Sequence, residues 1–155
     1  GRMITKQELV EGIRFAGKRA AATGANAKDW DHQLGHQWTT RDAFSHLAAT
    51  AGGAAGLYPL LDAGALSGIG ASRIAEGNAA AITNLKDKSK DEILAAIVEG
   101  QNASADFVAT LDEADLNKVV KLGGYEMEKG EIVAQIWIHH AIAHAYEASA
   151  RWPIT

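Results

Sequence analysis

The sequence predicts an all-α protein, and within that class a four-helix bundle whose long crossover carries a short extra helix. Three observations lead to this prediction. The chain holds only two prolines, Pro59 and Pro153; apolar residues recur every three to four positions in long segments; and two capping boxes mark helix starts. A chain of 155 residues is long enough for a single core, so residues 1–155 are expected to form one domain.

The first helix is expected within residues 4–24. Its apolar face consists of residues at helical spacing, namely Leu9, Ile13, Ala16 and Ala20. Gly24 is expected to end this helix, because glycine is common just after a helix C-terminus. Residues 29–38 are rich in polar and aromatic side chains and are predicted to form a loop.

The second helix has a clear start signal. Thr39 fits the N-cap position and Asp42 the third helical position of a capping box. Apolar residues then follow at a period of 3.6: Phe44, Leu47, Ala51, Ala55, Tyr58 and Leu61. Pro59 falls within this pattern, so the helix is expected to kink or end nearby.

A glycine-rich crossover and two further helices are expected in the middle of the chain. Residues 64–70 form the predicted crossover, and a shorter helix that contains Asn78 and Ile82 follows at 71–85. Residues 89–92 read Ser-Lys-Asp-Glu, a second capping box, which opens a helix that runs to about residue 112.

Residues 113–129 are predicted to be a polar connection, with a short extended piece at 118–122. The last helix is expected over about 130–151. One stripe of that helix carries residues at helical spacing: Val133, Trp137, His140, His144 and Ala148.

The composition excludes several classes of function. A net charge of −4 gives no indication of a basic surface for nucleic acid. The sequence also contains no run of about 18 apolar residues, the length that a membrane-spanning helix needs. No signal-peptide pattern is found, so a cytoplasmic protein is expected. The chain has no cysteine, which excludes disulfides and thiolate-bound metals, and any metal must therefore be held by nitrogen and oxygen ligands.

The most informative residues are His140 and His144, four positions apart on one predicted helix face. His46, on another predicted helix, could complete a set of three ligands with an open position for water or substrate, which is typical of catalytic metal sites. Imidazole suits zinc, nickel, copper or iron. The alternative is that His140 and His144 are core histidines bonded to carboxylates such as Glu147.

The surroundings of His46 favour the metal interpretation. The same helix face carries short side chains, namely Asp42, Ala43, Thr50 and Gly53. Such residues leave space for a cavity. Asp42 is expected to orient the His46 ring from the second coordination shell, or to serve only the helix cap, or both.

The other polar candidates have competing interpretations. His32 and His36 repeat the same spacing within a predicted loop and are interpreted as solvated residues, and His139 as a bystander about 100° away from His140. Glu147 is the candidate catalytic residue, as a general base, and also a candidate extra ligand or second-shell partner. The competing interpretation pairs Glu147 with Arg151 on the surface. The chain lacks the Glu-x-x-His, His-Glu-x-x-His and glycine-rich nucleotide-binding motifs.

Residues 38–47 read Trp-Thr-Thr-Arg-Asp-Ala-Phe-Ser-His-Leu, which resembles the Trp-Thr-x-x-Asp-x-x-x-His-Leu start of the second helix in DinB-like proteins. The last helix of those proteins carries His-x-x-x-His, matched here by His140 and His144. Segments 78–85 and 89–116 resemble the N-terminal branch of mycothiol-dependent maleylpyruvate isomerases, including its Asp-Leu turn at residues 115–116. The similarity covers nearly the whole chain.

The resemblance implies a DinB-like four-helix bundle with one divalent metal, zinc or nickel, held by three side chains. It also implies thiol-dependent S-transfer with a low-molecular-weight thiol such as mycothiol or bacillithiol. The isomerase branch commonly has Glu-x-x-x-His where this chain has two histidines, and the chain lacks that enzyme's additional C-terminal domain. Maleylpyruvate isomerase activity itself is therefore not expected.

These considerations predict a divalent-metal-binding bundle with His46, His140 and His144 as ligands, acting as a thiol-dependent S-transferase or isomerase-type enzyme on a small-molecule substrate. One alternative is a hydrolase that uses metal-bound water. A second is a non-catalytic bundle in which the histidines bind metal only for stability. A third is a dimeric binding module that uses surface helices.

Overall fold

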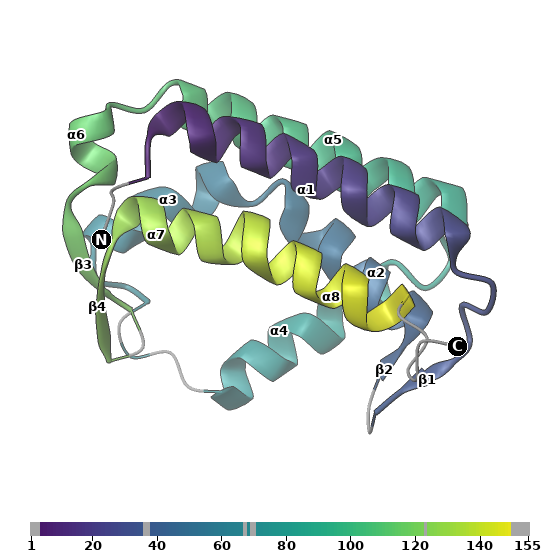
Figure 1. Cartoon of the computed structure of the whole chain (residues 1–155). Coiled ribbons are helices and arrows are strands. Elements are labelled where there is room, and N and C mark those ends of the chain that lie inside the picture. The colour runs from purple at the N-terminus through teal and green to yellow at the C-terminus, as the bar shows by residue number, and fades with distance from the viewer. Residues whose placement is uncertain (1–3, 36–37, 67, 69–70, 123, 150–155) are drawn as a thin grey trace.

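The computed structural model describes residues 4–35, 38–66, 68, 71–122 and 124–149. Within these residues the protein is mostly helical, with two small antiparallel strand pairs at opposite ends of the molecule (Figure 1). The predicted all-α class is therefore confirmed. None of the helices in this part of the chain has the length and apolar character needed to cross a membrane.

The bounds of the elements follow chain order. The helices are α1 (Lys6–Asn26), α2 (Thr40–Ala51), α3 (Ala54–Asp62), α4 (Ala71–Asn84), α5 (Lys90–Ala109), α6 (Glu113–Leu116), α7 (Lys129–Ala134) and α8 (His140–Ser149), with a π-helical segment, η1 (Gln135–His139), between the last two. The strands are β1 (Gln33–Leu34), β2 (Trp38–Thr39), β3 (Val119–Leu122) and β4 (Tyr125–Glu128).

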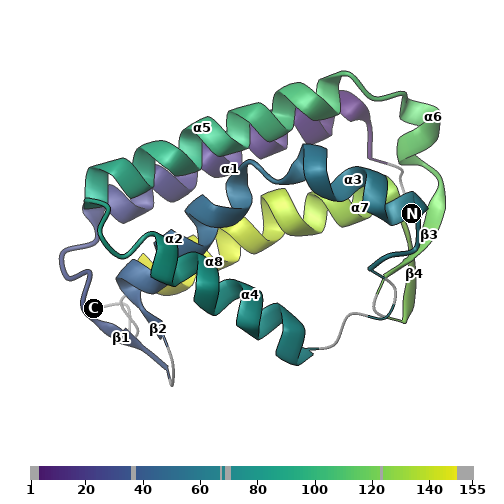
Figure 2. The same cartoon turned by 180° about the vertical axis from the view of Figure 1, so that it is seen from behind.

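The long helical segments pack around a shared interior. Helix α1 lies along α5 and also packs against α8, while α2 packs against both α5 and α8. Seen from behind, α2 and α3 follow each other across the layer formed by α1, α5 and the α7–α8 segment (Figure 2). Helix α4 packs against α2 and lies outside this group. The arrangement brings α2 next to α8, which is what the candidate site requires.

Buried apolar residues form two clusters, one toward each end of the molecule. The first cluster joins α1, α3, α5 and α7 and contains Leu9, Ile13, Tyr58, Leu61, Val108, Leu116, Ile132, Val133 and Trp137, among others. The second joins α1, α2, α5 and α8 and contains Ala20, Phe44, Leu47, Ile93, Leu94, Ile97, Ala141, Ala145 and Ala148, among others. The apolar stripes predicted from the sequence supply most of these residues.

Both capping boxes are confirmed. The Thr39 hydroxyl accepts a hydrogen bond from Asp42 N–H, and the Asp42 carboxylate accepts one from Thr39 N–H. Ser89 and Glu92 make the same reciprocal pair at the start of α5. A third box, formed by Thr5 and Glu8, starts α1. Each box satisfies backbone donors that the first helical turn leaves unpaired.

The predicted end of the first helix at Gly24 is wrong, because α1 continues to Asn26. Gly24 is buried where α1 approaches its neighbours. A Cβ atom at this position would lie 2.5 Å from Leu94 Cδ2 and 3.0 Å from Phe44 Cε1. The glycine is therefore required for close packing rather than for a left-handed cap.

The second predicted helix does end early, but at Gly52–Gly53 rather than at Pro59, which lies inside α3. The break is stabilised from α5, since the Ser104 hydroxyl donates to Ala51 C=O at 2.6 Å and accepts from Ala54 N–H at 3.3 Å. A Cβ atom on Gly100 would lie 2.7 Å from Gly52 N, so only glycine allows this approach. Side chains distant in sequence thus determine where the helix ends.

The predicted helix at 71–85 is confirmed as α4, and the helix opened by Ser89 ends at Ala109. Of the crossover at 64–70, residues 67, 69 and 70 lie outside the described part of the chain.

The polar connection predicted at residues 113–129 contains a short helix, α6, that was not predicted. Its expected extended piece is confirmed as β3, which pairs with β4 in a hairpin. Strands β1 and β2 occur where only a loop was predicted.

A buried charged group fixes the junction between this hairpin and α7. Lys129 is fully buried, and its Nζ lies 2.7 Å from Asp62 Oδ1, 2.9 Å from Asp115 Oδ2 and 4.6 Å from the centre of the Tyr58 ring. Burial opposes the charge, but the two carboxylates outweigh it and raise the pKa of Lys129. Hydrogen bonds from Tyr58 and Lys129 hold the pKa of Asp115 well below its usual range.

Candidate metal centre

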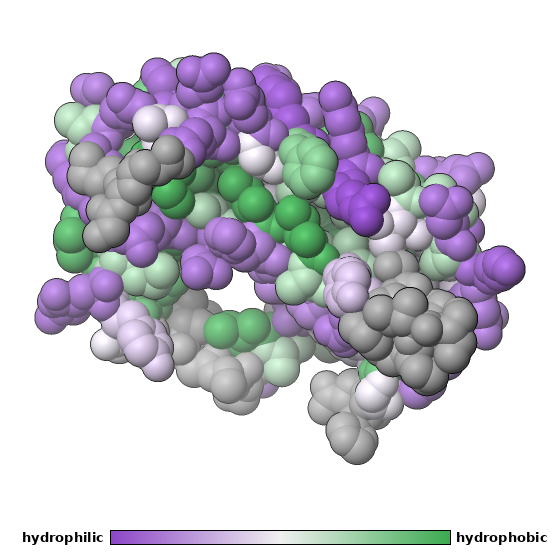
Figure 3. All heavy atoms as spheres, viewed as in Figure 1, coloured by the Kyte–Doolittle hydropathy of each residue, from purple (hydrophilic) through white to green (hydrophobic). Residues whose placement is uncertain are grey.

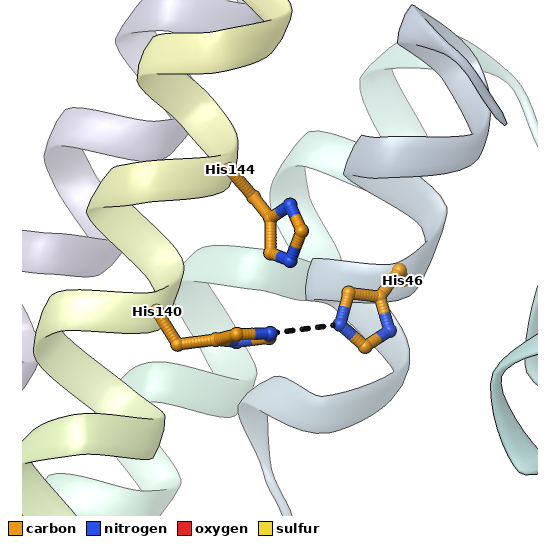
Figure 4. Close-up of side chains that lie close together, drawn as sticks. All are labelled: His46, His140 and His144. Carbon is orange, nitrogen blue, oxygen red and sulfur yellow. Dashed lines mark hydrogen bonds between the residues drawn. The ribbon is translucent and has the colours of Figure 1, made fainter. Parts of the chain in front are cut away.

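The structure brings together the three histidines predicted to bind a metal. His46 lies on α2, and His140 and His144 lie one turn apart on α8. The three rings point toward one another across the gap between these helices (Figure 4). One ring nitrogen from each residue lies within 4.8 Å of the corresponding atoms of the other two. The convergence follows from the packing of α2 against α8.

The spacing of these nitrogens fits shared coordination. His46 Nε2 lies 3.2 Å from His140 Nε2. Two nitrogens bound to one tetrahedral zinc at about 2.0–2.1 Å are expected to lie about 3.3 Å apart. The separation also suits a hydrogen bond between two neutral rings, if one of them carries its proton on Nε2.

The rings are held in their neutral form, which is the form that binds metals. Burial, followed by the proximity of His140 and His144, lowers the pKa of His46 from 6.5 to about 4. Burial and the proximity of His144 lower the pKa of His140 to about 4. Burial also lowers the pKa of His144. At neutral pH all three rings can therefore offer a lone pair to a cation.

Two buried ring nitrogens have no hydrogen-bond partner among the described residues, namely Nδ1 of His46 and Nδ1 of His140. An unpaired buried polar atom is costly. No hydrogen bond between Asp42 and the His46 ring is observed among the described residues, and the Asp42 carboxylate serves the helix cap, where it accepts from Thr39 N–H. The alternative of core histidines bonded to carboxylates is not observed for His140, whose Nδ1 has no partner among the described residues, and the Glu147 carboxylate lies 3.9 Å from His144 Nδ1. Ligation of a metal through Nε2 would leave the ring proton on Nδ1, and among the described residues these two N–H groups lack the acceptor that usually orients a ligating histidine.

Glu147 lies beside the site rather than in it. Its Oε2 atom is 3.9 Å from His144 Nδ1, and its side chain is 59% exposed. Glu147 is not part of the cluster of possible ligands, and the distance is too long for a direct hydrogen bond to His144. The competing pairing with Arg151 falls outside the described residues. His32 is exposed, as predicted, and His36 also falls outside the described residues.

Trp38 is a site residue that sequence reasoning missed. Its ring centre lies 5.0 Å from that of His46 and 5.5 Å from that of His144. The indole therefore covers one side of the histidine cluster and limits access of water. Its position immediately before the capping box of α2 could have indicated that Trp38 lies near His46. The direction of the Trp38 side chain, however, depends on the pairing of β1 with β2.

The π-helical segment before His140 was also missed. His140 N–H donates to Gln135 C=O, five residues back, which inserts an extra residue into the turn. The buried Gln101 side chain donates to Trp137 C=O within this segment and to Ile13 C=O on α1, each at 2.8 Å. His139 is not part of the cluster of possible ligands, as predicted, although its side chain lines the same pocket as His140.

A pocket of about 710 Å³ opens beside the histidines. Residues from α2, α3, α4, β3, η1 and α8 contribute to its wall: His46, Thr50, Leu57, Leu66, Ile74, Asn78, Leu122, Gln135, Ile136, His139, His140 and Ala143. The predicted cavity thus exists and Thr50 lines it. Asp42, Ala43 and Gly53 do not, since Ala43 is buried in the core and Gly53 approaches Trp137. Helix α4 contributes Ile74 and Asn78 to the wall of this pocket.

Comparison of the chain with protein-family models, with curated proteins and with solved structures found no match. The resemblance to DinB-like proteins stays a prediction. The observed site consists of three neutral histidines beside a large, mainly apolar pocket.

The lowered histidine pKa values predict how the stability of the metal-free chain depends on pH. Between pH 6.5 and about 4 the unfolded chain binds more protons than the folded chain, because His46 and His140 are protonated only after unfolding. The free energy of unfolding is therefore expected to fall as the pH is lowered through this range. Urea titrations with a chelator present would measure it.

The matched control for this pH effect is the double variant His46→Gln, His140→Gln. It removes both titrating groups while keeping polar side chains of similar size. Its free energy of unfolding is expected to change less between about pH 7 and about pH 5 than that of the unmodified chain. An identical pH dependence in both proteins would contradict the assignment of the lowered pKa values to these rings.

Proposed function

We propose that the chain is a divalent-metal-binding four-helix bundle of the DinB-like type that acts as a thiol-dependent S-transferase or isomerase-type enzyme. His46, His140 and His144 are the ligands, with zinc or nickel as the metal. The observation that carries the proposal is the convergence of three imidazole nitrogens within 4.8 Å beside a pocket of about 710 Å³. A set of three protein ligands leaves a coordination position open, as catalytic sites require.

The residues present fit a divalent cation. The donor set is three neutral nitrogens, and the Nε2 atoms of His46 and His140 lie 3.2 Å apart, a separation that suits two nitrogens on one cation. A cation held there would lower the pKa of a thiol or water and so provide a nucleophile at neutral pH. Trp38 packs against the rings of His46 and His144, and the pocket lined by His46 and His140 receives the substrate.

A specific observation also favours hydrolysis as a second candidate. The chain has no cysteine, so a thiol must be supplied by a cosubstrate. Low-molecular-weight thiols that carry carboxylates would need cationic partners, and no Lys or Arg is among the described residues that line the pocket. Water has no such requirement. Hydrolysis of an uncharged ester or amide is therefore the alternative reaction.

The test begins with the metal content of the purified chain, measured by elemental mass spectrometry. About one zinc or nickel per chain is expected. The metal-loaded chain is then assayed with an uncharged electrophilic arene, with and without a low-molecular-weight thiol, and with an uncharged aryl ester. Product that forms only with thiol supports S-transfer, whereas thiol-independent ester cleavage supports the hydrolase. Bound metal with neither reaction would contradict both enzymatic proposals.

A further inference from the structure

We infer that the pocket beside the histidines takes an uncharged, mainly apolar small molecule, with its polar reactive end directed at His46 and His140. This inference deepens the proposed function and depends on it for the role of the histidine end. The preference for an uncharged molecule depends only on the pocket wall.

The wall is apolar along most of its length. Five aliphatic side chains line it, four of them on α3, α4, β3 and η1 and one between α3 and α4, namely Leu57, Ile74, Leu122, Ile136 and Leu66. In the space-filling view, hydrophobic residues lie on the α4 side of the hollow between α4 and the main body of the protein, and hydrophilic residues border its upper side (Figure 3). A volume of about 710 Å³ lies within the range of about 300–1,000 Å³ that is typical of pockets for drug-sized molecules.

The polar groups of the wall carry no fixed charge. Among the described lining residues there is no Asp, Glu, Lys or Arg, and the polar side chains are Thr50, Asn78, Gln135 and the three histidines at positions 46, 139 and 140. An ionised group placed against the aliphatic wall would lose hydration without gaining a counter-ion. Amide side chains such as Asn78 and Gln135 instead suit the hydroxyl or carbonyl groups of a neutral molecule.

Ile74 supports the same interpretation from the rim. It is 54% exposed yet lines the pocket from α4, so a large apolar side chain stands in solvent at the entrance. A bound apolar molecule would cover this side chain and remove its surface from water. The site therefore combines a histidine end, an uncharged middle and an apolar rim.

The test uses two fluorescent probes that differ by one sulfonate group, N-phenyl-1-naphthylamine and 8-anilinonaphthalene-1-sulfonate. Each is titrated into the full chain, once with a chelator and once with zinc. The neutral probe is expected to bind at least about tenfold more tightly than the anionic probe in the chelated form, because the sulfonate finds no cationic partner in the wall. Equal binding, or tighter binding of the sulfonate, would overturn the inference.

Two matched variants show whether the probes occupy this pocket. Ile74→Lys introduces a cation at the rim, and Leu60→Lys introduces one at another exposed aliphatic position, 42% exposed on α3 and not part of the wall. Ile74→Lys is expected to reduce the preference for the neutral probe at least about threefold, and Leu60→Lys to leave it unchanged. Equal changes in both variants would place the probes elsewhere and refute the inference.

Metal measurements on the same samples separate this inference from the proposed function. A chain that binds no zinc but still prefers the neutral probe, with the effect of Ile74→Lys retained, would refute the metal enzyme and support the pocket. A chain that binds zinc through the histidines but shows no preference between the probes would refute the pocket inference and leave the metal centre standing.

Discussion

Replacing any one of His46, His140 and His144 with alanine is expected to reduce zinc affinity by more than about 100-fold. Loss of an outer-shell partner typically costs 10–100-fold, and loss of a direct ligand costs more. Among the described residues the cluster contains no fourth histidine or carboxylate, so the two remaining histidines would hold the cation alone. Titration of metal-free protein with a competing zinc chromophore would measure the change.

Two other histidines provide matched controls. His32→Ala removes an exposed histidine that is not part of the ligand cluster, and His139→Ala removes the immediate neighbour of a ligand, itself exposed on the pocket wall. Both variants are expected to keep zinc affinity within about threefold of the unmodified chain. If His139→Ala loses zinc as fully as His140→Ala, the ligand set is wrong. Circular dichroism on each variant would show whether the helices are intact.

Truncation of Lys129 is expected to lower the free energy of unfolding by about 2–3 kcal/mol. Lys129→Ala leaves a cavity in the first core cluster and removes the cation shared by Asp62 and Asp115. Breaking a fully buried ion pair typically costs about 3–5 kcal/mol. The expected loss is smaller here because the side chains of Asp62 and Asp115 are 59% and 27% exposed, so water can solvate both carboxylates once the lysine is removed. Urea denaturation would measure the loss.

Lys129→Met separates packing from charge in this prediction. Methionine keeps most of the side-chain volume but loses the charge, so it is expected to cost less than alanine. Asp62→Asn removes the more exposed partner and is expected to cost less than about 1 kcal/mol. A loss below about 1 kcal/mol for Lys129→Ala would show that this buried charge contributes little to the junction between the hairpin and α7.

Local sequence signals predicted the parts of the fold that depend on neighbouring residues. The capping boxes at Thr39 and Ser89 located two helix starts to the residue, because each box is completed within four positions. Helix ends were less predictable. Gly24 packs against Leu94, so α1 continues past this glycine. The second helix ends at Ala51, whose carbonyl accepts a hydrogen bond from Ser104. Both contacts join segments that are far apart in the sequence.

The histidine cluster was predictable from sequence for a similar reason. His140 and His144 share a face through helical spacing alone, and the small residues around His46 indicated an inward position. The contribution of Trp38 depends on strand pairing with residues 33–34. The position of His139 depends on the π turn, whose Trp137 carbonyl is paired with Gln101 on α5. Neither tertiary contact leaves a periodic signal in the sequence.

The two core clusters support different parts of the proposed site. The flanks of the ligand-bearing helices, such as Leu47 and Ala141, belong to the second cluster. The aliphatic pocket residues Leu57, Leu122 and Ile136 pack against the first. Substitutions that reshape the pocket therefore act on a different set of packed residues from those that hold the ligands. Such a division lets substrate range diverge during evolution, or under laboratory selection, while the metal-binding residues stay in place.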